Sequence, residues 1–411
     1  MKKSRVNIFI FALGAISLFL LAGVAAASPQ NNNHQFQSYL RQGVKKAFNM
    51  EFSGANSCLQ KAVESDRENP SGYAFLAIIN LFAYEMSFDD NVRKSKEVLL
   101  QRYVDETVVR GKKQIGKNPQ DGRAYLAMAM AGMVRFKFAS QRRQYFRMSR
   151  EASTIWEYLE KAKENDPQNY DIYFLTGSFR YHIDHLPRVT RFLSSMAVTS
   201  GDRRKGLQEL ELAAQKGDLL KELAQSELSA NYLNFEKQPA RALPIIQKLR
   251  ENFPGNYNFS FALANALSDL HRFDDAVHIA REIEKNIAAG STPFVPQLQP
   301  RYDLLMGRIY FTQGEYSKAE LFLQKSLQDT TPYNARVRSW AYLRLGMISD
   351  VRKERKKAKE YYFKALDTKE GEGAAQFEAG KCLKTACVPP AGKKMAEMPS
   401  HSLNSNGNQG R

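Results

Sequence analysis

The residue patterns most able to do chemistry are a segment with two glycines and a lysine, and a pair of histidines. Gly111 to Asn118 reads GKKQIGKN, which is close to the phosphate-binding loop of nucleotide-binding proteins. Asn118 stands where that loop needs a Ser or Thr hydroxyl for magnesium, and the segment lies at the end of a helical pattern, not between a strand and a helix. We therefore predict no nucleotide site here.

The histidines, His182 and His185, are three residues apart in YHIDH and could share one face of a helix as metal ligands. No HExxH pattern and no third ligand at a fixed spacing accompanies them, and histidines near a helix end commonly bond its last carbonyl groups. The chain also lacks a G-x-S-x-G nucleophile motif. The sequence therefore predicts no catalytic residue, no metal, no cofactor and no small-molecule substrate, and it does not predict an enzyme.

Three cysteines exclude a disulfide-dense scaffold and a four-cysteine zinc site. Cys382 and Cys387 lie five residues apart, where the expected closing helix runs into Pro389 and Pro390. On a continuous helix their side chains would point apart, so a disulfide requires the helix to end after Lys384. Both the bonded and the free states remain open. Cys58 is expected to be a small core residue.

Two basic stretches, Arg135 to Arg150 and Pro187 to Gly206, carry arginines interleaved with aromatic residues. We define the basic face by six of these arginines: Arg142, Arg143, Arg147, Arg150, Arg203 and Arg204. It could dock an acidic partner, an anionic glycan or lipid headgroups. The alternative is a solvated face whose aromatic residues, such as Phe138, Tyr145 and Phe146, point into the fold.

The first 27 residues have the composition of a signal peptide. Lys2, Lys3 and Arg5 precede an apolar run to Ala22, and Ala25 to Ala27 offers the small residues that a signal peptidase cleaves after. We predict an exported protein, periplasmic or associated with the cell envelope, cleaved after Ala27; the alternative is an uncleaved anchor. Cleavage would lower the net charge from +17 to +14. The export signal, and not the charge, argues against nucleic acid as a partner.

The elements that must position these residues are helices. Hydrophobic residues make up 43% of the 411 residues and charged residues 25%, which excludes disorder of the whole chain. Helical periodicity is broken at Pro70, Pro119, Pro167 and Pro254, at spacings of 49, 48 and 87 residues. Each unit holds two helices whose apolar face only the next pair can cover, and the longest interval accommodates two units.

We therefore predict an all-α fold, a right-handed α-solenoid of about eight antiparallel helix hairpins with a C-terminal closing helix. The hairpins are expected near residues 36–69, 71–118, 121–166, 169–217, 219–253, 257–289, 300–331 and 335–369, and the closing helix near 373–384. Residues 28–35 are expected to be a polar linker, 290–300 a loop whose Phe294, Val295 and Leu298 pack onto the array, and 388–411 a disordered tail.

Residues 302 to 332 place bulky, small, aromatic, glycine, alanine and proline residues in a fixed order, with Gly307, Tyr310, Gly314, Ala319 and Pro332 among them. In this order the segment resembles the tetratricopeptide repeat family. A second copy contains Gly346 and Ala358 but has Lys353 where the family prefers glycine, and a third contains Ala264 and Ala280. Residues 254–387 resemble the family by motif, and residues 36–253 resemble it mainly in hairpin architecture, with longer helices.

The resemblance implies that the first helices of successive hairpins line a groove that holds segments of other proteins. By the family's spacing, the groove-lining residues are Asn258, Phe261, Asn265, Arg301, Leu304, Arg308, Phe311, Trp340, Leu343 and Met347. The family's clamp for heat-shock-protein tails needs a lysine where Phe261 or Leu304 stands, so that specialised function does not carry over.

Two functions follow as hypotheses. The first is an exported, non-enzymatic scaffold that binds protein or peptide partners in the groove, in cell-envelope assembly or secretion. The alternative is a peripheral solenoid that binds membranes or polyanions through the basic face. Salt dependence of envelope association separates them, because raised ionic strength would release the second and spare the first.

Overall fold

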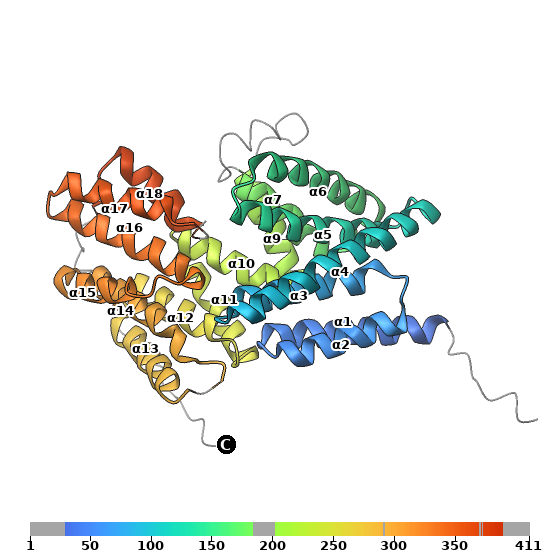
Figure 1. Cartoon of the computed structure of the whole chain (residues 1–411), viewed down its shortest axis with the longest axis horizontal. Helices are drawn as coiled ribbons and strands as arrows, with labels where there is room; N and C mark the ends of the chain where they lie inside the picture. The colour runs from blue at the N-terminus through green and yellow to red at the C-terminus, as the bar shows by residue number, and fades with distance from the viewer. Residues whose placement is uncertain (1–28, 184–201, 291, 370, 372, 389–411) are drawn as a thin grey trace, which may run out of the picture. The chain divides into compact units, whose positions relative to one another are not determined.

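The computed structural model describes the chain except for residues 1–28, 184–201, 291, 370, 372 and 389–411. The described residues form seventeen α-helices and two short 3-10 helices, and no strand (Figure 1). The predicted all-α solenoid fold is confirmed. The expected signal peptide, His185 and nearly all of the expected tail lie outside the described residues.

The helices follow one another in pairs, with bounds close to those predicted from the prolines. The pairs are α1 (Pro29–Phe48) and α2 (Phe52–Ser65), α3 (Pro70–Met86) and α4 (Asp90–Lys117), α5 (Gly122–Gln141) and α6 (Tyr145–Asn165), α7 (Asp171–His182) and α9 (Arg203–Lys216), α10 (Lys221–Asn234) and α11 (Pro239–Asn252), α12 (Tyr257–Asp269) and α13 (Phe273–Ala288), α14 (Gln299–Gln313) and α15 (Tyr316–Ser326), and α16 (Ala335–Val351) and α17 (Arg355–Asp367). Helix α18 (Ala374–Lys384) contacts both α16 and α17.

One boundary was predicted wrongly. Helix α1 begins at Pro29, so residues 29–35 are helical and are not a linker. Proline is favoured in the first turn of a helix, because its fixed φ suits the helix and its missing N–H would have no intrahelical partner there. The polar residues that follow it give no apolar periodicity, so the sequence alone did not reveal this part of the helix.

Six of the turns between paired helices contain a residue with positive φ: Met50, Arg143, Lys237, His271, Gly314 and Lys353. In the α16–α17 turn, the N–H of Lys353 donates to the carbonyl of Asp350, and that of Glu354 donates to Ser349. These are the bonds of a glycine-type helix end, which satisfies carbonyl groups that the helix leaves free. Lys353 therefore takes the conformation for which the tetratricopeptide pattern uses glycine.

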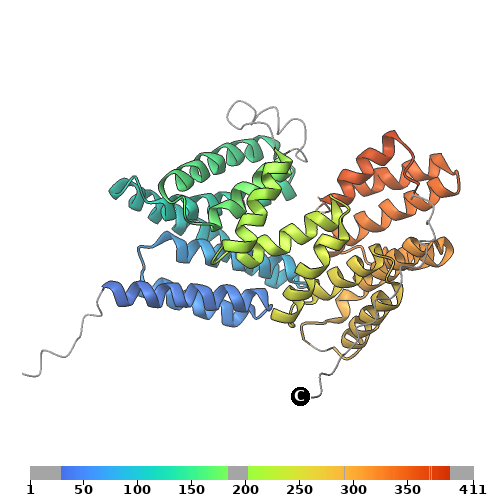
Figure 2. The same ribbon diagram turned by 180° about the vertical axis from the view of Figure 1, so that it is seen from behind.

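The described chain divides into two compact units. The first holds residues up to Tyr84 together with Asn91–Val134 and Thr154–Gln168; the second holds Glu85–Asp90, Arg135–Ser153 and Asn169 onward. In the first unit, Ala55, Leu59 and Ala62 of α2 are fully buried. In the second, consecutive helices from α9 to α18 contact each other (Figures 1 and 2).

The segment between α13 and α14 packs as predicted at two of three positions. Phe294 and Leu298 are buried, the latter in the 3-10 helix η2 (Pro296–Leu298), while Val295 is half-buried. The Phe294 ring lies 6.0 Å from the ring of Tyr257 on α12. Among the described residues, no helix combines the length and the apolar character needed to span a bilayer.

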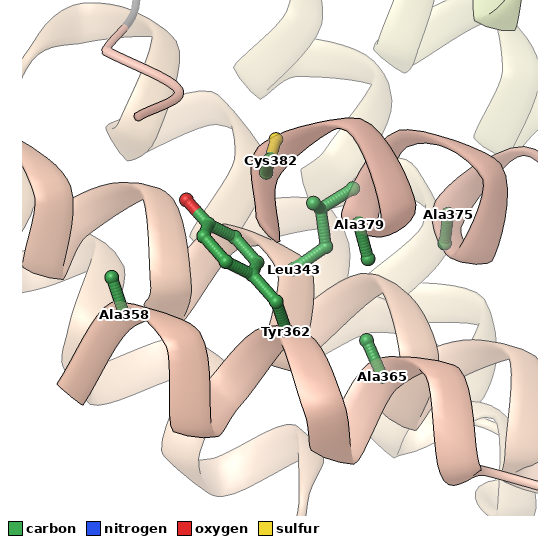
Figure 3. Close-up of a cluster of buried hydrophobic side chains, with 7 residues drawn as sticks. All are labelled: Leu343, Ala358, Tyr362, Ala365, Ala375, Ala379 and Cys382. Carbon is green, nitrogen blue, oxygen red and sulfur yellow. The ribbon is translucent and has the colours of Figure 1, made fainter. Parts of the chain in front are cut away.

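Helix α18 closes the C-terminal end through a small apolar core. Ala375, Ala379 and Cys382 of α18 pack against Tyr362 and Leu343, and all five are buried (Figure 3). Small residues on α18 let this short helix approach α16 and α17 closely. The end of the stack is therefore covered, as repeat arrays require.

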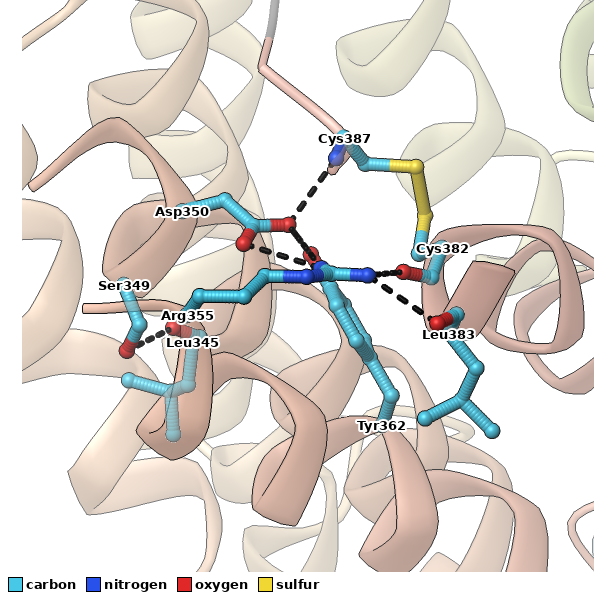
Figure 4. A network of polar contacts seen from close by, with 8 residues as sticks. All are labelled: Leu345, Ser349, Asp350, Arg355, Tyr362, Cys382, Leu383 and Cys387. Atoms are coloured by element: carbon cyan, nitrogen blue, oxygen red, sulfur yellow. Dashed lines mark hydrogen bonds and ion pairs between the residues drawn. A yellow bond between two sulfur atoms is a disulfide. The ribbon is translucent and has the colours of Figure 1, made fainter. Parts of the chain in front are cut away.

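A polar network fixes the same end (Figure 4). The carboxylate of Asp350, whose side chain is 1% exposed, accepts hydrogen bonds from Tyr362 Oη at 2.7 Å and from the Cys387 N–H at 2.9 Å, and it pairs with Arg355 at 2.9 Å. Arg355 also donates to the carbonyls of Cys382 and Leu383 at the end of α18. Cys382 and Cys387 form a disulfide, which the helix end at Lys384 makes geometrically possible.

Candidate partner-binding face

Helices α12, α14 and α16, the first helices of the last three hairpins, lie next to one another. Helix α12 contacts α14, and α14 contacts α16, so the three form one layer, which we call the first-helix layer. Their partners α13, α15 and α17 each pack against the first helix of the same hairpin. Side chains of the first-helix layer that remain accessible are therefore presented together on one side of this layer.

The close packing inside three of the hairpins rests on a glycine at a fixed spacing from the side chain that covers it. A Cβ added to Gly307 would lie 2.8 Å from the side chain of Leu323, sixteen residues later. A Cβ added to Gly346 would likewise collide with the ring of Tyr362, again sixteen residues later. In the first unit, a Cβ added to Gly43 would lie 2.7 Å from the side chain of Leu59, at the same spacing. The same spacing between a glycine and the side chain that covers it therefore recurs in three hairpins.

Two solved structures align with this chain at low similarity. A tetratricopeptide repeat protein from Parabacteroides merdae aligns with a TM-score of 0.33 and 12% identity over 75% of this chain and 99% of that one. The TPR domain of P58(IPK) aligns with a TM-score of 0.21 and 15% identity over 85% of this chain and 98% of that one. No protein-family model and no curated protein matches the chain. Identities this low carry no function over to this chain.

The structure buries two of the ten residues expected to line the groove. Phe261 is 2% exposed and Leu343 is 1% exposed. Phe261 is covered by the guanidinium of Arg301, which lies 4.4 Å from the ring centroid, and Leu343 belongs to the core under α18. Their assignment as partner-binding residues is therefore corrected: both are packing residues, because neighbouring helices and side chains occupy the space where a partner would have to lie.

The other eight are half-buried. Leu304 and Phe311 pack on the edge of the core between α15 and α16, while Trp340 and Met347 pack on the edge of the core under α18. Each therefore has one side fixed by the fold and another accessible, which is how anchor residues of binding surfaces are placed. Asn265 is also half-buried. Their contact with a partner stays a prediction.

Three predicted residues come together at one end of the layer. Arg301 Nη1 donates to Asn258 Oδ1 at 2.6 Å, and the same guanidinium covers the rings of Phe261 and Tyr257. Burial lowers the pKa of Arg301, with the charge of Arg336 acting in the same direction and that of Tyr257 opposing it. Arg301 is thus held in place by an amide and two aromatic rings.

Five charged side chains lie near one another around helix α16. We call them the Arg344 cluster, which consists of Lys237, Asp269, Arg308, Arg344 and Glu378. Arg308 of α14 pairs with Asp269 at the end of α12, and their side chains are 12% and 24% exposed. Arg344 of α16 is 7% exposed, and its guanidinium lies 4.8 Å from the centroid of the Trp340 ring. Lys237, in the α10–α11 turn, is exposed.

Sequence reasoning found Arg308 but missed Arg344, Lys237 and Asp350. Arg344 lies between Leu343 and Leu345 in a stretch of α16 whose residues are all buried. A single cation inside such an apolar stretch was an available signal. Lys237 gave none, because its place beside α16 and α18 depends on how α10 packs: Phe235 at the end of α10 lies 6.1 Å from Phe377 of α18.

The six arginines of the basic face differ in their exposure and in their partners. Arg203 pairs with Glu236 at 2.8 Å and covers the Tyr181 ring, and Arg143 donates to carbonyls at the end of α17. Arg142, Arg150 and Arg204 are exposed, and Arg147 is half-buried. The expectation that the aromatic residues point into the fold fails at the α5–α6 turn, where the side chains of Phe146 and Tyr145 are 79% and 37% exposed.

Of the two candidate metal ligands, only His182 lies among the described residues, and it has another partner. His182 lies 3.2 Å from Glu227 Oε1, which also accepts from Ser178 Oγ. Among the described residues, one group of three potential ligands is close enough to hold an ion: Glu378, Cys382 and Cys387. Because the two sulfurs are bonded to each other, they are not available as thiolate ligands.

Proposed function

We propose that this protein is an exported, non-enzymatic scaffold that binds protein partners on the first-helix layer, in the assembly of the cell envelope or in secretion. The observation that carries the proposal is the layer itself. Half-buried Leu304, Phe311, Trp340 and Met347 lie on neighbouring helices beside arginines whose positions are fixed by pairing or stacking. Preorganised apolar and cationic side chains of this kind lose little entropy on binding.

The experiment is site-specific photo-crosslinking in intact cells. A photoreactive phenylalanine analogue replaces Phe311 or Trp340 in turn, and captured proteins are identified by mass spectrometry. We expect discrete crosslinked species from both positions, because both are half-buried residues of the first-helix layer.

Matched controls are Leu321 of α15 and Phe363 of α17, which are 53% and 60% exposed on the second helices of the same hairpins. The proposal expects the species captured at Phe311 and Trp340 to be absent or much weaker at these two positions. Equal capture at all four positions would contradict it.

Export is supported by the composition of residues 1–27 and by the Cys382–Cys387 bond, because disulfides persist in oxidising compartments. The test is the mass of the mature N-terminus from the native host. We expect cleavage after Ala27, one residue before α1 begins at Pro29. A chain that starts at Met1 in the membrane fraction would favour a retained anchor.

A second candidate is binding to anionic membranes at the α5–α6 turn. It is favoured by Phe146, which is exposed among Arg142, Arg147 and Arg150. Aromatic residues next to cations suit a lipid interface. Sedimentation with phosphatidylglycerol vesicles tests it: binding that is lost at high salt and in Phe146→Ser would support this candidate, and no binding at low salt would exclude it.

A further inference from the structure

Arg344 is a buried cation for which the fold supplies no counter-ion. It is 7% exposed, and among the described residues its guanidinium has no hydrogen-bond or ion-pair partner, only the face of Trp340. The nearby carboxylate of Asp269 is already paired with Arg308. An unpaired buried charge is costly to a fold, so such an arrangement is typical of a site that receives its counter-ion from a ligand.

The surrounding charges add to the excess. Burial lowers the pKa of Arg344 to about 9, and the positive charge of the nearby Arg308 contributes to this decrease. The negative charge of Asp269 acts in the opposite direction. Lys237 lies near the same groups, with Arg308 and Arg344 as like charges and Glu378 and Asp269 as opposite charges. Glu378 in turn lies 3.4 Å from Lys381. Three cations, Lys237, Arg308 and Arg344, thus lie near two carboxylates, Asp269 and Glu378.

We propose that Arg344, Lys237 and Arg308 form a binding site for one carboxylate, supplied by a glutamate or aspartate side chain of a partner protein. One negative charge matches the single excess positive charge of the cluster, whereas a dianion would exceed it. Guanidinium and ammonium groups bind carboxylates by charge-assisted hydrogen bonds, which are stronger than neutral ones and gain further where water is excluded.

The neighbours of the cluster define the rest of the ligand. The ring of Trp340 lies under the guanidinium of Arg344. Met347 is on the same helix, α16, and Phe311 is on α14, the neighbouring helix of the first-helix layer. An acidic side chain flanked by leucine-sized apolar residues therefore fits both parts of this surface. The inference rests on the proposed function, because it names the chemistry of the partner that the first-helix layer would hold.

The fluorescence of Trp340 provides the test. The chain has two tryptophans, so Trp156→Phe leaves Trp340, under the Arg344 guanidinium, as the reporter. The probe is the N-acetylated, C-amidated peptide Ala-Leu-Glu-Leu-Ala, whose only carboxylate is the glutamate side chain. Comparison probes are the same peptide with glutamine, the glutamine peptide with a free C-terminus, and sodium acetate.

We expect a saturable change in Trp340 emission when the glutamate peptide is added. The other three probes should bind at least tenfold more weakly. The variants Arg344→Met and Lys237→Met should lose affinity for the glutamate peptide by a similar factor. Lys359→Met, at an exposed position of α17, is the matched control and should bind like the parent. Circular dichroism checks the fold, and Lys237→Met keeps the test valid if Arg344→Met fails to fold, because Lys237 is an exposed turn residue.

Equal binding of the glutamine peptide would overturn the proposal. Equal binding of acetate or of the free C-terminus would overturn the assignment to an acidic side chain. The two proposals fail separately. If crosslinking captures a partner at Phe311 and Arg344→Met does not weaken the capture, the carboxylate site falls and the scaffold stands. If the peptide binds and no partner is captured, the scaffold falls and the site stands.

Discussion

Helix α16 carries two buried charges six residues apart, and their surroundings differ completely. Asp350, at its C-terminal end, is bonded to a guanidinium, a tyrosine hydroxyl and a backbone N–H. Arg344, in its middle, has an aromatic ring and no counter-ion among the described residues. A buried charge with all its partners holds a fold together, whereas one without them is retained at a cost to stability. The comparison separates a structural end of the stack from a binding surface.

The largest expected effect is at the structural end. Asp350→Ala leaves Arg355, the Tyr362 hydroxyl and the Cys387 N–H without their shared acceptor, so we expect a loss of about 3–5 kcal/mol in the free energy of unfolding. Urea denaturation followed by circular dichroism measures it. Asp367→Ala, at an exposed position at the end of α17, is the control and should change stability by less than about 0.5 kcal/mol.

A loss below about 1 kcal/mol for Asp350→Ala would mean that the network is not important for stability. The raised pKa of Tyr362, caused by burial first and then by its hydrogen bond to Asp350, offers a second measurement. In the variant, that phenol should ionise at lower pH than in the parent.

The disulfide is expected to contribute less. Cys382 and Cys387 close a loop of only a few residues, for which the chain-entropy relation gives about 2 kcal/mol. We expect the double variant Cys382→Ser/Cys387→Ser and the reduced parent to lose this amount alike. Cys58→Ser, at the free cysteine, controls for loss of a thiol. If the reduced parent and the double variant lose clearly different amounts of stability, the loss in the variant comes from the serine side chains and not only from the missing bond.

Most of the fold could be predicted from the sequence, because its determinants are local. Prolines end helices, and the sixteen-residue spacing of Gly307 and Leu323 marks close packing of the two helices of a hairpin. Local residue types do not determine every turn. The α16–α17 turn has Lys353 instead of glycine, and backbone hydrogen bonds from Lys353 and Glu354 to the end of α16 maintain its conformation.

The candidate site was predictable only in part. The family spacing placed Leu304, Phe311 and Trp340 on accessible positions of the first-helix layer, but it also placed Phe261 there, which Arg301 covers. Whether a residue at such a position is accessible depends on side chains from the next helix. Lys237 comes to the Arg344 cluster from another hairpin, and nothing local in the sequence encodes that approach.

The smallest expected change is also the most direct test, and it compares two arginines in the same hairpin. Arg355 neutralises Asp350 and bonds two carbonyls, so Arg355→Met should lower the thermal midpoint markedly. Arg344→Met keeps a long side chain over Trp340 and removes an unpaired buried charge, so its thermal midpoint should be unchanged or higher, equivalent to at most about 2 kcal/mol of added stability. An equal loss of stability in the two variants would contradict the account, because it would make Arg344 a structural residue like Arg355.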